Sequence, residues 1–258
     1  SGNMHYYEGM ELGEIWGYTT VGFIEDSTTL NMINQKQEGA HSQHEIHEGD
    51  WGLGDIMYAD LNGDSVVNDG AKTIEDHGDL SIIGNETPDF SFNFSIGAQW
   101  KGFDIRTQWV GEGPSEWAPS MRDGYPAKYQ INMVKMLFWG SSYNDSELPV
   151  HKTHLDHWAP DNTDAYWPRP HFAHSLATTD RRSAFRNTQV QTKYLQNGAY
   201  LKLRNIQIGY TFPKKWIERV KLSRLRIYAS GENLLTFTNL RIFDPEDKGM
   251  EKKKKKVY

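Results

Sequence analysis

Residues 90–110 alternate apolar and polar side chains without a break on both sides of the dipeptide Lys101-Gly102. The apolar positions are the even-numbered residues from Phe90 to Trp100 and then the odd-numbered residues from Phe103 to Trp109. A side-chain period of two is typical of a β-strand that has one apolar and one polar face. The stretch therefore predicts a β-hairpin with a two-residue turn and an aromatic apolar face.

Two folds accommodate such a hairpin. In a soluble β-sandwich the apolar face covers a core, whereas in an outer-membrane β-barrel it faces lipid. A tilted strand needs about 9–11 residues to cross a bilayer, while soluble strands usually have about 5–6. Because the run 90–100 is long enough to cross, its length favours the barrel.

The composition agrees with a wet, ring-rich surface. Of the 258 residues only 37% are hydrophobic, yet 13% are aromatic, with 9 tryptophans, and the mean hydropathy is −0.72. Polar chains with many rings are typical of barrels and of sugar-binding surfaces. The net charge of −6 argues against a nucleic-acid partner.

Cysteine is absent, which excludes disulfides and thiolate metal sites. No run of 18 apolar residues occurs, so a spanning helix is excluded while a spanning barrel stays open. The amino terminus lacks the layout of a signal peptide. We therefore expect an internal piece or a mature domain of an exported protein.

A second hairpin is predicted near the carboxyl end. Residues 200–212 alternate in the manner of a strand, with a slip near Asn205 that predicts a β-bulge. The strand ends at Pro213. Residues 213–223 predict a short turn with one or two helical turns, and residues 224–240 resume as a strand.

The long segment 111–193 lies between the two hairpins and has no sustained period apart from a short apolar patch at 131–139. Outer-membrane barrels combine short periplasmic turns with long extracellular loops. We therefore expect 1–89 to be an extracellular loop region, 90–110 a barrel hairpin and 111–193 a long extracellular loop. Residues 194–258 would supply barrel strands and a periplasmic turn, with the last strand missing. Since about eight strands are needed to close a barrel, the chain is expected to be a fragment or an oligomer.

An EF-hand-like calcium loop is predicted within residues 60–79. Carboxylate, amide and backbone oxygens at alternate positions of a short loop are the ligands that Ca²⁺ prefers. Here they are the side chains of Asp60, Asn62 and Asp64 and the backbone carbonyl of Val66.

The usual twelfth position of the loop does not supply the last ligand, because Ala71 stands there and has no carboxylate. If residues 69–78 are an insertion, Asp79 becomes the closing ligand, in preference to Asp69 or Asp76. The alternative is an acidic surface loop without an ion. A bound ion would be structural, because a filled oxygen shell leaves no activated water.

Two histidine trios have a spacing of three residues, but both lie in polar loop sequence and are interpreted as solvated. The trios are His41, His44 and His47, and His151, His154 and His157. No spacing of carboxylates singles out an acid and a nucleophile. The sequence therefore predicts no enzyme.

Four loop tryptophans are candidate stacking platforms for a substrate: Trp117, Trp139, Trp158 and Trp167. Girdle or packing roles are the alternative for each ring.

Seven segments carry a resemblance to a known family. They are residues 13–18, 54–64, 83–90, 100–104, 194–205, 209–213 and 230–236. In order and spacing they resemble the carboxyl-terminal part of SusC/RagA-type TonB-dependent outer-membrane transporters, over nearly the whole chain. In that family an aspartate shortly precedes an Ile-Gly-Asn string, which implies Asp79 before residues 83–85 as the late calcium ligand. Ser65 stands where the family commonly has glycine.

The resemblance implies a fold class and a function. The fold is all-β, the antiparallel strands of a 22-stranded transmembrane barrel with long extracellular loops. The function is import of oligosaccharides or peptides across the bacterial outer membrane, driven by the TonB complex and assisted by a SusD-like surface lipoprotein. The alternative function is a secreted Ca²⁺-stabilised β-sandwich that binds carbohydrate. The plug and most strands are missing, so the segment alone is expected neither to close a barrel nor to transport.

Overall fold

A computed structural model describes residues 5–35, 41–46, 50–118, 155–170, 186–187, 189–218, 221–240 and 245–246. The chain forms two compact units. Unit 1 comprises Ser1–Glu86 and Ala118–Leu195, and unit 2 comprises Thr87–Trp117 and Gln196–Tyr258. Within the described residues no helix has the length and apolar character needed to cross a membrane.

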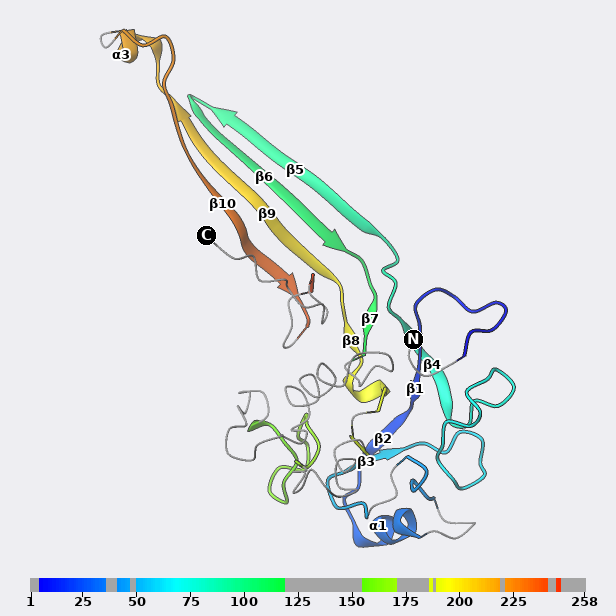
Figure 1. Ribbon diagram of the computed structural model, residues 1–258. Coiled ribbons are helices and arrows are strands. Elements are labelled where there is room, and N and C mark those ends of the chain that lie inside the picture. The colour runs from blue at the N-terminus through cyan, green and yellow to red at the C-terminus, as the bar shows by residue number, and fades with distance from the viewer. Residues whose placement is uncertain are drawn as a thin grey trace, which may run out of the picture. The chain divides into compact units, whose positions relative to one another are not determined.

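Unit 2 is built on a four-stranded antiparallel sheet with the strand order β10-β9-β6-β5 (Figure 1). Its strands are β5 (Ser91–Trp100), β6 (Phe103–Glu112), β9 (Tyr200–Thr211) and β10 (Arg226–Thr238). Both predicted hairpins are therefore confirmed. The sheet is open, and a closed barrel is not seen in the described part of the chain.

Lys101 and Gly102 form the turn between β5 and β6, and its backbone conformation explains why a glycine stands there. Lys101 has a φ of 47° and Gly102 a φ of 91°, and two positive φ values are the requirement of a type I′ turn. A Cβ on Gly102 would also lie 2.8 Å from the carbonyl oxygen of Thr211. Glycine is thus needed at the second position for both conformation and space.

The predicted bulge lies where the alternation slips. Asn205 pairs with Gln108, but the next pair joins Leu203 to Trp109, so Arg204 has no opposite residue on β6. The partner β10 is irregular at the same level, between Glu232 and Leu235. The apolar face of β9 therefore carries Leu201 and Leu203 on one side of the bulge and the even-numbered Ile206 and Ile208 on the other.

Between β9 and β10 the chain makes a short helical turn, α3 (Lys214–Ile217), directly after Pro213. The backbone N–H of Phe212 donates to the carbonyl of Leu225 at 3.0 Å and joins the two chain segments at the base of the turn. At the other end of the sheet β7 (Glu116–Trp117) pairs with β8 (Gln196–Asn197).

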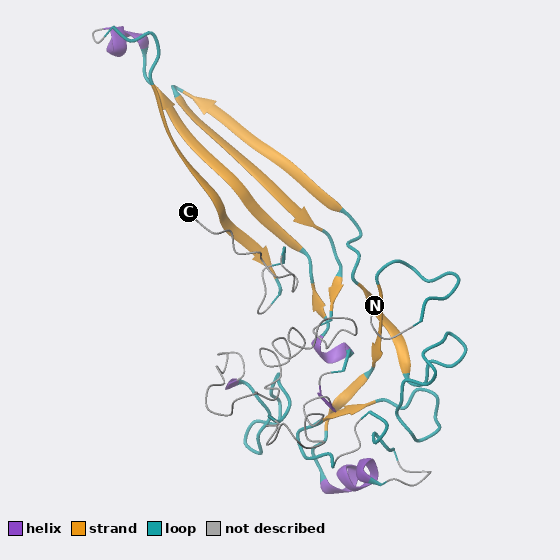
Figure 2. Ribbon diagram, viewed as in Figure 1, coloured by secondary structure: helices purple, strands orange, loops and turns teal. Residues whose placement is uncertain are grey.

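The described part of unit 1 contains short strands and an α-helix where the sequence predicts loops (Figure 2). β1 (Glu14–Tyr18) pairs with β4 (Leu80–Asn85), and β2 (Thr20–Phe23) pairs with β3 (Ile56–Tyr58). Helix α1 (Ser27–Asn34) begins at Asp26, whose carboxylate accepts hydrogen bonds from the backbone N–H groups of Thr28 and Thr29. A 3₁₀ turn, η3, spans Thr192–Tyr194. The fully buried side chains include Ile24, Ile33, Ile56, Tyr58, Val67 and Leu80.

A buried polar cluster joins distant parts of unit 1. The Asp55 carboxylate is fully buried, and it accepts from the side-chain amide of Asn187 at 2.8 Å and from the N–H of Gly52 at 2.8 Å. Arg186 Nη1 lies 3.3 Å from the same carboxylate and also donates to the carbonyl of Asp50. Because these segments are about 130 residues apart in sequence, the cluster fixes 50–56 against 186–187.

Candidate functional site

The four-stranded sheet has one continuous apolar face. The register places in one layer the side chains that the hairpin pattern selects: Phe92, Phe94, Ile96, Trp100, Phe103, Ile105, Ile208, Ile227, Leu235 and Phe237. All ten side chains are exposed. A row of large exposed apolar groups of this extent needs an apolar neighbour, since soluble monomers rarely leave such a patch in water.

Three of these side chains distinguish the two folds considered from the sequence. A sandwich requires Phe92, Phe94 and Ile105 to lie beneath a second sheet. In the structure they are 36%, 41% and 39% exposed. No other sheet of the described residues covers them.

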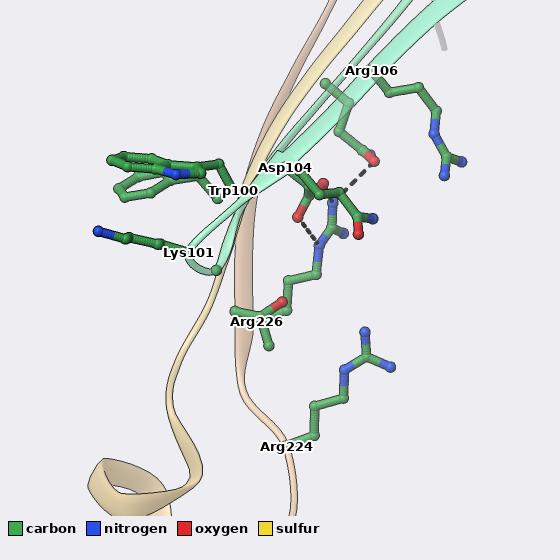
Figure 3. Close-up of a pocket in the computed structure, with 11 residues that line it drawn as sticks. Trp100, Lys101, Asp104, Arg106, Arg224 and Arg226 are labelled. Atoms are coloured by element: carbon green, nitrogen blue, oxygen red, sulfur yellow. Dashed lines mark hydrogen bonds and ion pairs between the residues drawn. The ribbon is translucent and has the colours of Figure 1, made fainter.

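The opposite face of the sheet is polar, and it includes Asn93, Gln99, Arg106 and Gln108. Near the turn between β5 and β6 an ion pair crosses this face. Arg226 Nε donates to Asp104 Oδ1 at 3.0 Å, and Arg226 Nη2 donates to Oδ2 at 2.5 Å (Figure 3). The two residues belong to β10 and β6, so the pair spans the intervening strand β9.

Gly209 of β9 makes this crossing possible. A Cβ at Gly209 would lie 2.5 Å from Arg226 Nη2 and 2.8 Å from Asp104 Oδ1. Only a residue without a side chain leaves room for the guanidinium above the strand. No pattern in the sequence groups Asp104, Gly209 and Arg226, because their contact depends on strand order.

Aromatic rings gather at the turn end of the sheet. Phe103 and Tyr210 lie 4.6 Å apart between ring centroids, Tyr210 and Phe212 5.0 Å, and Phe212 and Trp216 6.4 Å. Trp216 of α3 is 63% exposed. Amphipathic rings at the end of an apolar band are typical of a membrane–water boundary.

The acidic loop at 60–79 is folded on its own backbone. Asp60 accepts from the N–H groups of Gly63 at 2.7 Å and Ser65 at 2.8 Å. Asn62 Oδ1 accepts from the N–H of Asp64 at 2.9 Å. Ser65 has a φ of 70°, in the left-handed region that favours glycine. The loop thus has the sharp bend at its sixth position that an EF-hand-like loop requires.

Asp79 closes this loop from the other side. Its carboxylate is fully buried, and it accepts from the N–H of Leu61 at 2.6 Å and the N–H of Asn68 at 2.9 Å. No ion pair of Asp79 with a basic side chain is present among the described residues. Nor does the described part of the chain bring three or more acidic or histidine side chains together in a metal-holding group. The carboxylates of the loop are therefore of the right chemistry for Ca²⁺, but the described residues do not gather three of them in one group.

The predicted stacking tryptophans are buried where they are described. Trp117, Trp158 and Trp167 are 8%, 7% and 2% exposed, and Trp139 lies outside the described residues. Trp167 stacks on Tyr194 at 5.2 Å. Trp158 lies against Gly54, where a Cβ would be 2.3 Å from the ring. Because a buried ring has no free face for a sugar, these positions agree with the packing role that the sequence left open.

Two histidines of the first trio contact different backbone carbonyls. His41 Nε2 lies 2.7 Å from the carbonyl oxygen of Tyr58, and His44 Nε2 lies 2.9 Å from that of Asn34. His47, His151 and His154 lie outside the described residues.

Glu14 is a buried carboxylate of unit 1 whose pKa is shifted by its surroundings. It is 6% exposed, and burial alone raises its pKa. Hydrogen bonds from the Tyr7 hydroxyl at 2.5 Å, the N–H of Glu11 at 2.9 Å and the Trp16 indole at 3.1 Å outweigh that effect. The pKa of Glu14 is consequently held below its ordinary value.

Comparison with known proteins accounts for a sheet with these two faces. No protein-family model matches the chain. TonB-dependent receptor P3 of Formosa agariphila is 27% identical over 245 residues, which are 93% of this chain and 19% of that receptor. TonB-dependent receptor P39 of the same organism is 24% identical over 264 residues, covering 93% of this chain and 22% of that receptor. The chain matches a segment of the TonB-dependent receptors.

The chain spans about a fifth of the length of the curated relatives it matches. Among solved structures, the RagAB peptide importer in its 'closed-closed' state matches with a TM-score of 0.50 and 17% identity, over 95% of this chain and 22% of that chain. An identity this low speaks for the fold alone. TonB-dependent receptors reside in the bacterial outer membrane, and they are transporters and not enzymes. The comparisons agree with the localisation and the lack of catalysis expected from the sequence.

Proposed function

We propose that the chain is part of the wall of a SusC/RagA-type importer, a closed antiparallel barrel of 22 strands in the outer membrane. The proposal rests on the sheet of unit 2. Its strands have 10 to 13 residues, with an exposed apolar face on one side and a polar face on the other. The apolar face would contact lipid, and the polar face would line the lumen. Function in such a wall is passage of a solute, without chemistry on it.

The cargo proposed from the sequence is an oligosaccharide or a peptide. A solved structure with this fold belongs to a peptide importer, which supports a peptide as one candidate. The proposed partners are a SusD-like surface lipoprotein outside and the TonB complex inside. Lipid of the outer membrane is the third partner, and nucleic acid is not among them.

Neighbouring residues of β5 test the orientation of the wall. Phe94 lies on the apolar face and Asn93 on the polar face of the same strand, at nearly the same depth. The segment contains no cysteine, so Phe94→Cys and Asn93→Cys introduce single labelling sites here. In the full-length protein in lipid vesicles, brominated lipid should quench a fluorophore at position 94 and leave one at position 93 bright.

A reversed or equal result would contradict the proposal. Equal brightness at both positions, together with a full-length protein that stays monomeric and soluble without detergent, would instead support the secreted β-sandwich. In that fold a second sheet would cover Phe94.

The acidic loop has a proposed role of its own, as a holder of structural Ca²⁺. Its ligands would be the side chains of Asp60, Asn62, Asp64 and Asp79 and the carbonyl of Val66. What supports this is the oxygen spacing, the left-handed bend at Ser65, and the buried Asp79 carboxylate without a cationic side chain. A bound ion would draw the carboxylates together and neutralise them.

Calcium removal from the full-length protein tests the ion. The melting temperature should fall on addition of a chelator and return with Ca²⁺, and Asp64→Ala should abolish that response. Asp69→Ala is the matched control, because Asp69 lies in the same loop but pairs with Lys72 at 2.9 Å and is not in the ligand set. A parent protein whose melting temperature does not change with the chelator has no such ion.

A further inference from the structure

A cavity of about 530 Å³ lies on the polar face of the sheet, beside the turn between β5 and β6. Four charged side chains give it its character: Asp104, Arg106, Arg224 and Arg226. Figure 3 shows all four projecting to the same side of the strands, away from Trp100 and Lys101. Gln99 and Gln207 add amide groups to the lining.

The charges of this cavity do not balance. Asp104 is engaged by Arg226 through two hydrogen bonds, which leaves no bidentate position for a second arginine. Lys101 also borders the cavity, but its ammonium lies 4.8 Å from the centroid of the Trp100 ring. Three guanidinium groups against one carboxylate leave an excess of two positive charges.

The two unbalanced groups are Arg106 of β6 and Arg224, which precedes β10. Within the part of the chain that the structure describes, neither guanidinium has a hydrogen bond or an ion pair. They flank the Asp104–Arg226 pair from its two sides (Figure 3). A guanidinium presents a planar fork of N–H donors whose geometry matches a carboxylate or a phosphate.

We infer that Arg106 and Arg224 form a binding site for an oxyanion, a carboxylate or phosphate group, on the polar face of the wall. The Asp104–Arg226 pair, held flat by Gly209, forms the floor between them. A cleft with an excess of positive charge raises the local concentration of anions. The oxyanion is either free in solution or an acidic side chain of the same protein outside this segment.

The experiment compares three forms of the full-length protein in detergent: the parent, R106Q/R224Q, and K214Q/K215Q. The last is the matched control, since it removes the same two charges from α3, outside the cavity lining. Melting temperatures are measured in sodium phosphate and in sodium chloride at equal ionic strength, so that general screening is the same in both.

A free oxyanion predicts that phosphate raises the melting temperature of the parent and of K214Q/K215Q, but not of R106Q/R224Q. An acidic side chain of the protein predicts no response to phosphate, and a lower melting temperature for R106Q/R224Q than for both other forms. Two outcomes would show that the site does not exist. In the first, R106Q/R224Q melts at or above the melting temperature of K214Q/K215Q and responds to phosphate as the parent does. In the second, no form responds to phosphate and all three forms have the same melting temperature.

A milder variant guards against misfolding of the double mutant. R106K/R224K keeps both charges but loses the planar fork, so its response to phosphate, or its stability, should lie between those of the parent and R106Q/R224Q. The inference goes beyond the importer proposal and has a separate readout. Quenching by brominated lipid reports the apolar face, whereas the phosphate response reports the cavity, so either can fail without the other.

Discussion

Replacing Ile96 by arginine puts a charge at the centre of the apolar face, and replacing its neighbour Ser95 puts the same charge on the polar face. Ile96 is 58% exposed and pairs with Thr107, while Ser95 pairs with Gln108. Both are exposed residues in the middle of β5. The two variants therefore differ chiefly in the side of the sheet that receives the guanidinium.

The expected cost follows from the depth of these residues. β5 has ten residues, which at about 3.4 Å each make about 34 Å of strand. A tilt of about 40° reduces this to about 26 Å across the membrane, close to the apolar band of about 25 Å of such barrels. Positions 95 and 96 thus lie near the midplane, where arginine on the lipid face costs about 2–4 kcal/mol.

The assay is urea unfolding of the full-length protein refolded into lipid vesicles. Ile96→Arg should lower the free energy of unfolding by about 2–4 kcal/mol more than Ser95→Arg does. That difference is about 30- to 700-fold in the folding equilibrium constant. In water, by contrast, two exposed surface substitutions would both fall within about 0.5 kcal/mol.

Equal costs for the two variants would refute the assignment of the Ile96 face to lipid. A larger cost for Ser95→Arg would reverse the faces. Both variants introduce the same side chain at adjacent positions of one strand, so the charge and the length of the new side chain are the same in the two. Loss of the β-branched Ile96 contributes up to about 1 kcal/mol through strand propensity, which is less than the difference expected from lipid.

Three further substitutions test unit 1. Asp55→Asn should destabilise it by about 3–5 kcal/mol, because it removes the charge of a fully buried carboxylate that lies 3.3 Å from the buried Arg186 guanidinium. Limited proteolysis would detect this loss. The control Asp69→Asn breaks an exposed ion pair and should cost less than about 1 kcal/mol, and equal costs for the two variants would contradict a stabilising role of the buried cluster. Glu14 has a lowered pKa in the folded state. Its contribution to the free energy of unfolding is therefore fully present above its unfolded pKa of about 4.3, and it is lost as the pH falls through the lower folded pKa. Glu14→Gln should therefore flatten the dependence of melting temperature on pH in the acid range, and an unchanged slope would contradict the hydrogen bonds to Glu14. Ser65→Gly should raise stability by about 1 kcal/mol in thermal unfolding, since it relieves a left-handed conformation, and a loss would show that the serine side chain contributes something else.

The sheet of unit 2 was predictable because its signals are local. Alternation over ten residues, a Lys-Gly turn and a slip near Asn205 are each contained in a short window of sequence. The pairing of β6 with β9 was not, since their residues are about 100 positions apart and no period reports a neighbour at that distance. For the same reason the contact of Asp104 with Arg226 emerged only from the structure.

Unit 1 escaped prediction for two different reasons. All five residues of β1 are buried, so the strand shows no alternation of apolar and polar positions. Helix α1 has only Ile33 as a buried residue, which leaves no stripe with a helical period. Its one local signal was Asp26 before a Ser-Thr-Thr run, the pattern of a helix N-cap.

The aromatic rings in the core of unit 1 are buried, whereas those on the apolar face of the sheet in unit 2 are exposed, and this contrast supports lipid as the neighbour of the sheet. In unit 1 Trp51, Tyr58, Trp158, Trp167 and Tyr194 are buried, so this chain is able to enclose its rings when a protein core is available. In unit 2 Phe94, Trp100 and Phe103 stay exposed at 41%, 69% and 56%. A soluble fold would gain about 1.5–3 kcal/mol for each large side chain it covered. Ten such side chains exposed on one regular face therefore need an apolar neighbour, which the hydrocarbon of a membrane would supply along the whole face.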